Sequence, residues 1–376
     1  MKKFRIEKEH QRMKISQYLR EVQNYSGRSL RNVEVFLNGK QVRLTKKLPS
    51  HGNLRVVEKK KGTDIKPIKL PLDIIFEDED ILVVNKEPFL LTHPTQKKAD
   101  FTLANGIVNH FLEKYGEVRV PRFYNRLDMN TSGLIIIAKN SFAQAFLQNF
   151  SIFEKKYLAI VNGIIDDKEI ARINEELAKD GENHKIQDFE KENLKTEVEK
   201  VRKDGKIENE EFEEKENFEK DNKEISESLK FDKENEKKDS DLINKKFEKD
   251  EKDEKNKIII ERRIFRDGDN LERIIDERGQ YAKTVVKVLK TYPEKNVTLV
   301  ECELFTGRTH QIRVHLKSIG HTIVGDELYG NGLNKELGIN RQFLHAYKVK
   351  FTHPASKEEV ELEIPIFTDM KDFLEK

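Results

Sequence analysis

The chain has 376 residues, of which 37% are charged and 36% are hydrophobic. That length allows two or three domains, and so high a charge content predicts that part of the chain is disordered. A single cysteine, Cys302, excludes an intrachain disulfide and fits a buried strand residue. Because no stretch approaches the roughly 20 apolar residues of a membrane span and no apolar run follows the basic start, a cytoplasmic protein is expected.

Charge is distributed unevenly along the chain. The formal net charge is only +2, yet residues 1–61 hold 17 Lys and Arg against 5 Glu. A basic end on a nearly neutral chain favours a polyanionic partner. A basic surface without a dedicated ligand is the alternative interpretation.

Residues 1–62 are predicted to form a small module of their own. The predicted elements are a helix over 15–22, a short helix opened by Ser29, a hairpin around Asn38-Gly39 and a strand over 54–57. This order, with its scattered Arg and Lys, resembles a small RNA-binding module shared by a ribosomal protein and several RNA-modifying enzymes. A linker over 63–73 follows, stiffened by two prolines.

The main domain is expected to begin at residue 74. Residues 81–84 are an apolar run typical of a buried strand, and residues 102–115 have the spacing of an amphipathic helix with Thr102 as its cap. A second helix is predicted from Ser141, again with that residue as the cap.

The most informative stretch is 123–140, where a polar loop enters the apolar block 134–138. Asp128 therefore precedes a core strand, in a turn supplied by residues 130–133. A carboxylate beside a core and two residues from Arg126 is costly unless it is paired. The alternative is that Asp128 only caps the turn, as Asp often does.

A strand with a basic entry is predicted over 155–163, and Tyr157 is either a functional residue or an ordinary strand aromatic. From 166 to 257 the chain changes character, and residues 201–257 hold 21 Asp and Glu against 16 Lys and Arg. Such dense charge cannot bury enough surface to offset the ordering entropy. We predict a disordered or loosely helical insertion, which acts as a spacer or contacts a partner.

Order is expected to resume at 258, with a strand over 297–305, a Thr-Gly turn and a helix that ends at Gly320. His310 and His315 are five apart, so one helix face does not present both to a metal. The sequence has neither a Walker loop nor a dinucleotide-binding glycine fingerprint. No metal and no nucleotide cofactor are therefore expected.

Several of these segments together resemble the RluA-like family of RNA pseudouridine synthases. The residues that carry the resemblance are Arg126-Leu127-Asp128 with Thr131-Ser132-Gly133-Leu134, and the segments 77–86, 155–163, 304–316, 320–330, 343–346 and 351–354. Three positions depart from the family pattern: Glu87 separates Lys86 from Pro88, Asn125 replaces a His, and Thr322 replaces a Pro.

The resemblance implies conversion of uridine to pseudouridine by Asp128, with no cofactor. Nucleophilic addition at the base, attack at the ribose carbon and proton abstraction at the ribose all remain open. It further implies that Arg313 pairs with Asp128, that Tyr157 packs on the flipped base, and that Arg126 fills the gap left in the RNA. Asn125 would support the loop or contact RNA.

The same resemblance implies RNA contacts from Arg308, His310 and Gln311. The expected fold is α+β, with a mixed, mostly antiparallel sheet, flanking helices and a cleft, plus the small basic module. The expected domains are 1–62, the linker 63–73, a catalytic domain of 74–165 with 258–376, and the insertion 166–257.

A monomer acting on ribosomal RNA is expected, with transfer RNA as the other candidate substrate. An inactive RNA-binding or ribosome-assembly factor is the alternative function. A glycosidase-like hydrolase would need two carboxylates, and these segments supply no second one.

Overall fold

The computed structural model describes residues 2–23, 25, 27–31, 33–58, 62–94, 101–151, 153–180, 256–268, 270–330 and 339–376. Internal contacts divide the chain into two compact units, Met1–Ile160 with Ile323–Lys376, and Val161–Thr322. The first 58 residues belong to the first unit. None of the described helices is long and apolar enough to cross a membrane.

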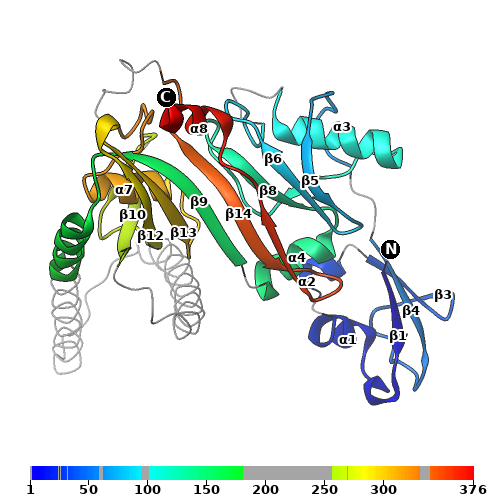
Figure 1. Ribbon diagram of the computed structural model, residues 1–376. Helices are drawn as coiled ribbons and strands as arrows, with labels where there is room; N and C mark the ends of the chain where they lie inside the picture. Colours follow the sequence, from blue (N-terminus) through cyan, green and yellow to red (C-terminus); the bar gives the residue numbers. More distant parts are fainter. Residues whose placement is uncertain are drawn as a thin grey trace, which may run out of the picture. The chain divides into compact units, whose positions relative to one another are not determined.

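The N-terminal part of the first unit is a small antiparallel sheet in the order β1-β4-β2-β3 (Figure 1). Its elements are β1 (Lys2–Ile6), η1 (Lys8–His10), α1 (Ile15–Glu21), α2 (Gly27–Leu30), β2 (Val33–Leu37), β3 (Lys40–Val42) and β4 (Gly52–Glu58). The predicted hairpin is confirmed: Asn38 and Gly39 both have positive φ, 49° and 83°, as a tight two-residue turn between twisted strands requires. Strand β1 was not predicted, because lysine and arginine interrupt its apolar alternation.

The rest of the first unit is built on a sheet in the order β9-β14-β8-β6-β5, with β7 on β8 and β15 on β14 (Figure 1). Its strands are β5 (Asp73–Glu77), β6 (Ile81–Lys86), β7 (Arg122–Phe123), β8 (Ser132–Ala138), β9 (Phe153–Asn162), β14 (Leu344–Thr352) and β15 (Glu359–Glu363). Every pair is antiparallel except β8 with β14, which is parallel. The expected mixed, mostly antiparallel sheet is confirmed.

Three labelled helices accompany this sheet, α3 (Leu103–Tyr115), α4 (Ser141–Phe150) and α8 (Thr368–Glu375). The predicted helix after Thr102 is confirmed, and the amide and hydroxyl of Thr102 both donate to Asn105 Oδ1. The predicted cap at Ser141 is wrong by one residue: Asn140 is the cap, and its Oδ1 accepts from the amide of Ala143.

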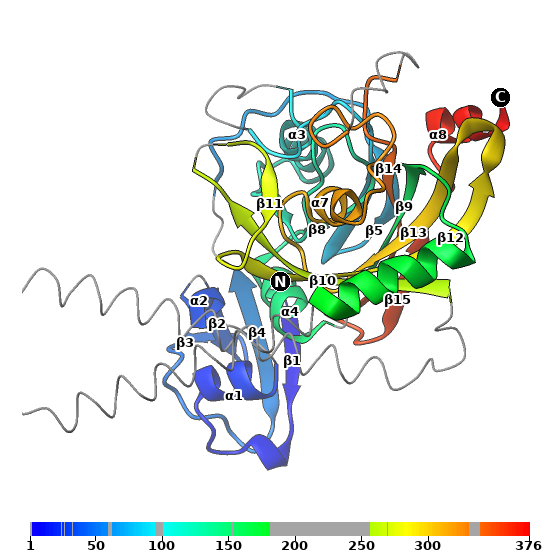
Figure 2. The same cartoon turned by 90° about the vertical axis from the view of Figure 1, so that its left-hand side faces the viewer.

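The second unit contains strands in the order β11-β10-β12-β13 and the short helix α7. Its bounds are β10 (Lys257–Arg266), β11 (Arg273–Ile275), β12 (Gln280–Tyr292), η3 (Pro293–Lys295), β13 (Val297–Leu304) and α7 (Gln311–Ser318). Helix α7 packs against β10, β11 and β12 (Figure 2). Cys302 lies buried on β13, as predicted.

The stretch predicted as a disordered insertion begins with an ordered helix over 167–180. Ile170 and Ile173 are buried on it, and Asn174 Nδ2 donates to the carbonyl of Lys257 at 3.0 Å, in the strand on the other side of the insertion. The first residues of the stretch are therefore a helix that packs within the second unit. Residues 181–255 lie outside the described part of the chain.

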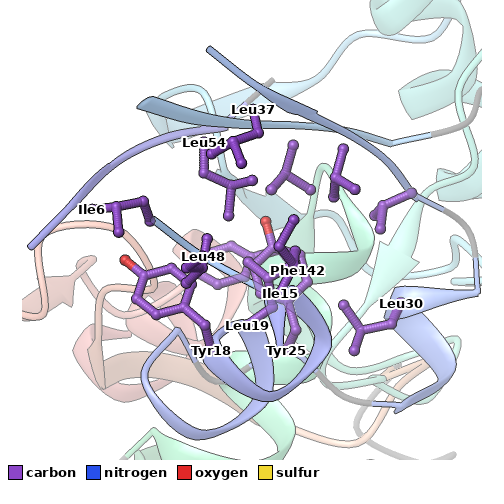
Figure 3. Close-up of a cluster of buried hydrophobic side chains, with 13 residues drawn as sticks. Ile6, Ile15, Tyr18, Leu19, Tyr25, Leu30, Leu37, Leu48, Leu54 and Phe142 are labelled. Atoms are coloured by element: carbon purple, nitrogen blue, oxygen red, sulfur yellow. The ribbon is translucent and has the colours of Figure 1, made fainter. Parts of the chain in front are cut away.

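A cluster of buried side chains fills the N-terminal sheet and its helices, and it includes one residue from outside them (Figure 3). Phe142 of α4 is buried in this cluster, with its ring centroid 4.8 Å from that of Tyr25. Lys2 forms an ion pair with Asp80, which is also buried. These contacts attach the N-terminal residues to the rest of the first unit.

Candidate active site

Asp128 lies between β7 and β8, and we call residues 125–133, which include the first two residues of β8, the Asp128 loop. The amide of Thr131 donates to the carbonyl of Asp128 at 3.1 Å, closing the turn that the sequence predicts. Gly133, the second residue of β8, has φ 117°, which side chains rarely tolerate, and it pairs with Ala346 of β14. Asp128 itself is half-buried at the edge of the core strand.

Asn125 closes the beginning of the loop against β8. Its Nδ2 donates to the carbonyl of Leu134 at 3.1 Å, and its Oδ1 accepts from the amide of Ile136 at 2.8 Å. The side chain of Asn125 is buried, so water does not reach these two backbone groups of β8, and the amide of Asn125 satisfies them instead. This geometry favours the loop-supporting role that the sequence left open for Asn125.

Two side chains from the segment that begins at β6 hold the loop by its carbonyl groups. Thr92 Oγ1 donates to the carbonyl of Leu127 at 2.9 Å. Lys86 Nζ donates to the carbonyl of Met129 at 3.0 Å and to that of Leu90 at 2.9 Å. The residues on either side of Asp128 are thereby fixed by buried donors.

The segment that leads into β14 holds the end of the loop. Arg341 Nη1 donates to the carbonyl of Asn130 at 3.3 Å, and Gln342 Nε2 donates to Thr131 Oγ1 at 3.2 Å. Ser132 Oγ lies 2.9 Å from His345 Nδ1. The loop is therefore anchored at consecutive residues from two separate parts of the chain.

The charge of Asp128 acts on two buried neighbours. Burial lowers the pKa of Lys86 to about 7, while the Asp128 carboxylate opposes that shift. Burial raises the pKa of Tyr157, and the negative charge of Asp128 raises it further, so the phenol keeps its proton. Asp128, Lys86 and Tyr157 thus share one electrostatic environment in the first unit.

Arg126 differs from its loop neighbours because its side chain is exposed. Burial lowers the pKa of His93, and the charge of Arg126 lowers it further. The His93 ring also lies 4.7 Å from that of Phe123. An exposed guanidinium one residue from the buried Leu127 is free to meet a polyanion while the loop stays fixed.

The remaining predicted residues lie in the second unit, around the start of α7. Gln311 is buried; its Nε2 donates to the carbonyl of Lys283 at 2.9 Å, and its Oε1 accepts from the amide of Arg308 at 3.0 Å. Arg308 and His310 are half-buried, and His310 has φ 58°. Arg313 is buried on α7. The contacts of Gln311 fix the turn before the helix.

The sequence analysis missed the anchors Lys86, Arg341 and Gln342. Lys86 had a recognisable signal, since it is a charged residue that directly continues an apolar strand. Arg341 and Gln342 had none, because their loop partners lie 211 residues away in the chain. Within the described ranges, no group of three or more His, Cys, Asp or Glu could hold a metal ion.

Comparison with known proteins gives a match to the family described as RNA pseudouridylate synthase over residues 80–318. Ribosomal large subunit pseudouridine synthase D of Neisseria meningitidis serogroup A is 30% identical over 356 residues, which cover 90% of this chain and 67% of that protein. The uncharacterized RNA pseudouridine synthase YhcT of Bacillus subtilis is 30% identical over 304 residues, 80% of this chain and 70% of that protein.

Among solved structures, Human RNA Pseudouridylate Synthase Domain Containing 1 is similar with a TM-score of 0.45 and 21% identity. The similarity covers 78% of this chain and 83% of that one. The family match spans more than half of this chain and contains the Asp128 loop, β9 and α7. The chain therefore belongs to the RNA pseudouridylate synthase family, whose members are isomerases.

Proposed function

We propose that Asp128 is the catalytic carboxylate with which this protein converts uridine in structured RNA to pseudouridine. The observation that carries the proposal is the anchoring of the loop: buried donors hold the carbonyl groups on both sides of Asp128. A reacting group held by its neighbours loses little orientational freedom at the moment of reaction. The reaction breaks an N-glycosidic bond and reattaches the same base through carbon, so it needs no energy source.

The other residues take roles around the base. A uracil inside a helix must be flipped out of the stack to be reached. Tyr157, whose phenol stays protonated, would pack on the flipped ring, and Arg126 would occupy the vacated space in the RNA. Arg313 would be the cation that keeps Asp128 ionised; this role rests on the resemblance of the segment 304–316 to the family motif.

Arg308 and His310 would contact RNA at the start of α7. Gln311 and Asn125 would act indirectly, since the amide groups of both bind the backbone. Their substitution should weaken RNA binding only through the local structure that they hold.

The favoured substrate is ribosomal RNA, with transfer RNA second. Support comes from the relatives named as ribosomal large subunit pseudouridine synthase D and from the basic N-terminal residues. The N-terminal sheet with its two helices would act as an RNA-binding module of the ribosomal-protein type, in a cytoplasmic monomer. Mapping pseudouridines in total RNA from cells with and without this protein would identify the substrate.

The deciding experiment compares Asp128→Asn with the unaltered protein on ribosomal RNA transcripts. We expect no pseudouridine from the variant and an unchanged Kd for RNA, since the substitution keeps the shape of the side chain. Asp372→Asn, an exposed position on α8, is the control and should keep full activity. Turnover by Asp128→Asn would reject the assignment. RNA binding without turnover by the unaltered protein would favour the inactive RNA-binding factor.

A further inference from the structure

The guanidinium of Arg341 connects the C-terminal helix to the Asp128 loop. Its Nε and Nη2 each lie 2.6 Å from an oxygen of Asp369 in the first turn of α8, a two-pronged ion pair. Its Nη1 donates to the carbonyl of Asn130 at 3.3 Å and to that of Gln342 at 3.1 Å. The side chain of Arg341 is only 2% exposed, so water reaches the ion pair only from the side of the Asp369 carboxylate.

His345, which is completely buried, forms a second connection between the C-terminal segment and the Asp128 loop. Its Nε2 lies 3.1 Å from the carbonyl of Pro365, which can only accept, so Nε2 carries the proton. Its Nδ1 then accepts from Ser132 Oγ at 2.9 Å. The short segment 365–369 therefore reaches two residues of the loop through two buried side chains.

Helix α8 is also held in place independently of these bridges. Met370 on the helix is completely buried, and the ring of Phe373 lies 5.3 Å from that of Phe343. The helix therefore has packing contacts besides the ion pair of Asp369, whose side chain is 41% exposed.

We propose that the C-terminal segment 365–369 sets the position of the Asp128 loop, with Arg341 and Asp369 as positioning residues. This inference rests on the proposed function of Asp128. Without the Asp369 carboxylate, the guanidinium of Arg341 loses the two bonds that orient it. The carbonyl of Asn130 then loses a donor in a fixed position. Asp128, two residues away, then samples positions outside the reactive geometry, and a misplacement of about 1 Å can cost about a hundredfold in rate.

The test compares Asp369→Asn with Asp372→Asn in the full chain. Both substitutions make the same chemical change on the same helix, but Asp372 is exposed and no described side chain is paired with it. We measure kcat and KM on ribosomal RNA transcripts, together with amide hydrogen exchange of the Asp128 loop and of β6. The expected result for Asp369→Asn is a fall in kcat of about ten- to a hundredfold with KM unchanged.

Amide exchange separates a positioning role from a general loss of stability. The proposal requires faster exchange in the Asp128 loop and unchanged exchange in β6, whereas Asp372→Asn changes neither. A kcat for Asp369→Asn equal to that of the control overturns the proposal, and so does equally faster exchange in both segments. If the unaltered protein forms no pseudouridine, the proposed function fails, and loop exchange alone still decides whether Asp369 positions the loop.

Discussion

Gly133 and Ala346 face each other where β8 and β14 meet in parallel register, and their backbones approach so closely that no side chain fits between them. A Cβ atom on Gly133 would fall well inside contact distance of the Ala346 carbonyl oxygen and amide nitrogen. Gly133 also has φ 117°, which disfavours any L side chain. Because Gly133 ends the Asp128 loop, this contact fixes where the loop enters the sheet.

Gly133→Ala should therefore lower the free energy of unfolding by more than about 3 kcal/mol, since backbone strain and a clash act together. The matched control is Gly116→Ala at the end of α3, where φ is 67° and no atom lies within 4 Å of an added Cβ. The free energy of unfolding of this control should fall by only about 1 kcal/mol. Urea unfolding measures both, and equal losses would show that the approach to Ala346 is not what demands glycine.

Asn125 gives a second prediction, which separates loop support from RNA contact. Asn125→Asp removes the donor to the Leu134 carbonyl and puts a carboxylate against that oxygen. The free energy of unfolding should fall by about 2–3 kcal/mol, because a buried acceptor is left unpaired. Asn149→Asp serves as the control, since that side chain also donates to a carbonyl but lies on an exposed surface.

The RNA affinity of Asn125→Asp, measured where the protein stays folded, should match that of the unaltered chain to within about twofold. Both proteins must be compared at one salt concentration, because phosphate contacts make affinity salt-dependent. Weakened RNA binding with unchanged stability would assign Asn125 to the RNA surface instead.

The parts of this fold that the sequence predicts are those with short-range causes. The hairpin follows from Asn38-Gly39, the Asp128 turn from a run of small polar residues before an apolar block, and β6 from four consecutive apolar residues. The helix cap at Asn140 was placed one residue too late, since Asn140 and Ser141 are both good caps.

The anchors of the loop could not be predicted in the same way. Lys86 reaches a carbonyl 43 residues further along the chain, and Arg341 joins residues 211 before it and 28 after it. No periodicity or local spacing records such a pairing. Strand β1, whose apolar alternation is interrupted by lysine and arginine, also depends on a distant partner, since β4 starts 46 residues after β1 ends. The sequence therefore predicts a candidate catalytic residue but not the side chains that hold its loop.

Phe142 leads to a prediction about the N-terminal residues. Phe142 lies on α4, and its side chain packs among the buried side chains of the N-terminal sheet. The amine of Lys357 lies 5.5 Å from its ring centroid. Phe142→Ala should weaken the packing of the N-terminal residues against the rest of the first unit by about 3 kcal/mol or more. Limited proteolysis should then cut within 62–72 at a protease level that spares the unaltered chain.

Phe142→Leu keeps most of the apolar volume and is the appropriate control, with protection close to that of the unaltered chain. Equal resistance of the alanine and leucine variants would mean that the ion pair of Lys2 with Asp80 is enough to hold the two parts together.

The last prediction concerns pH, and it follows from the burial of His345. Burial and, to a smaller extent, the nearby charge of Arg341 lower the pKa of this imidazole from its ordinary 6.5 to about 4. The unfolded chain therefore binds a proton at a pH where the folded protein does not. Its contribution to stability is complete above pH 6.5 and is lost as the pH falls towards 4.

Between pH 7 and pH 5 this residue alone should reduce the free energy of unfolding by about 2 kcal/mol. Urea unfolding at the two pH values measures the loss, and His345→Gln, which does not titrate, should show a loss smaller by that amount. His315 has a pKa lowered to about 4 as well and acts in both proteins, so the difference between them isolates His345. The same pH dependence in both proteins would mean that the folded protein binds a proton at His345 as readily as the unfolded chain does. The neutral imidazole inferred between Ser132 and Pro365 would then be wrong.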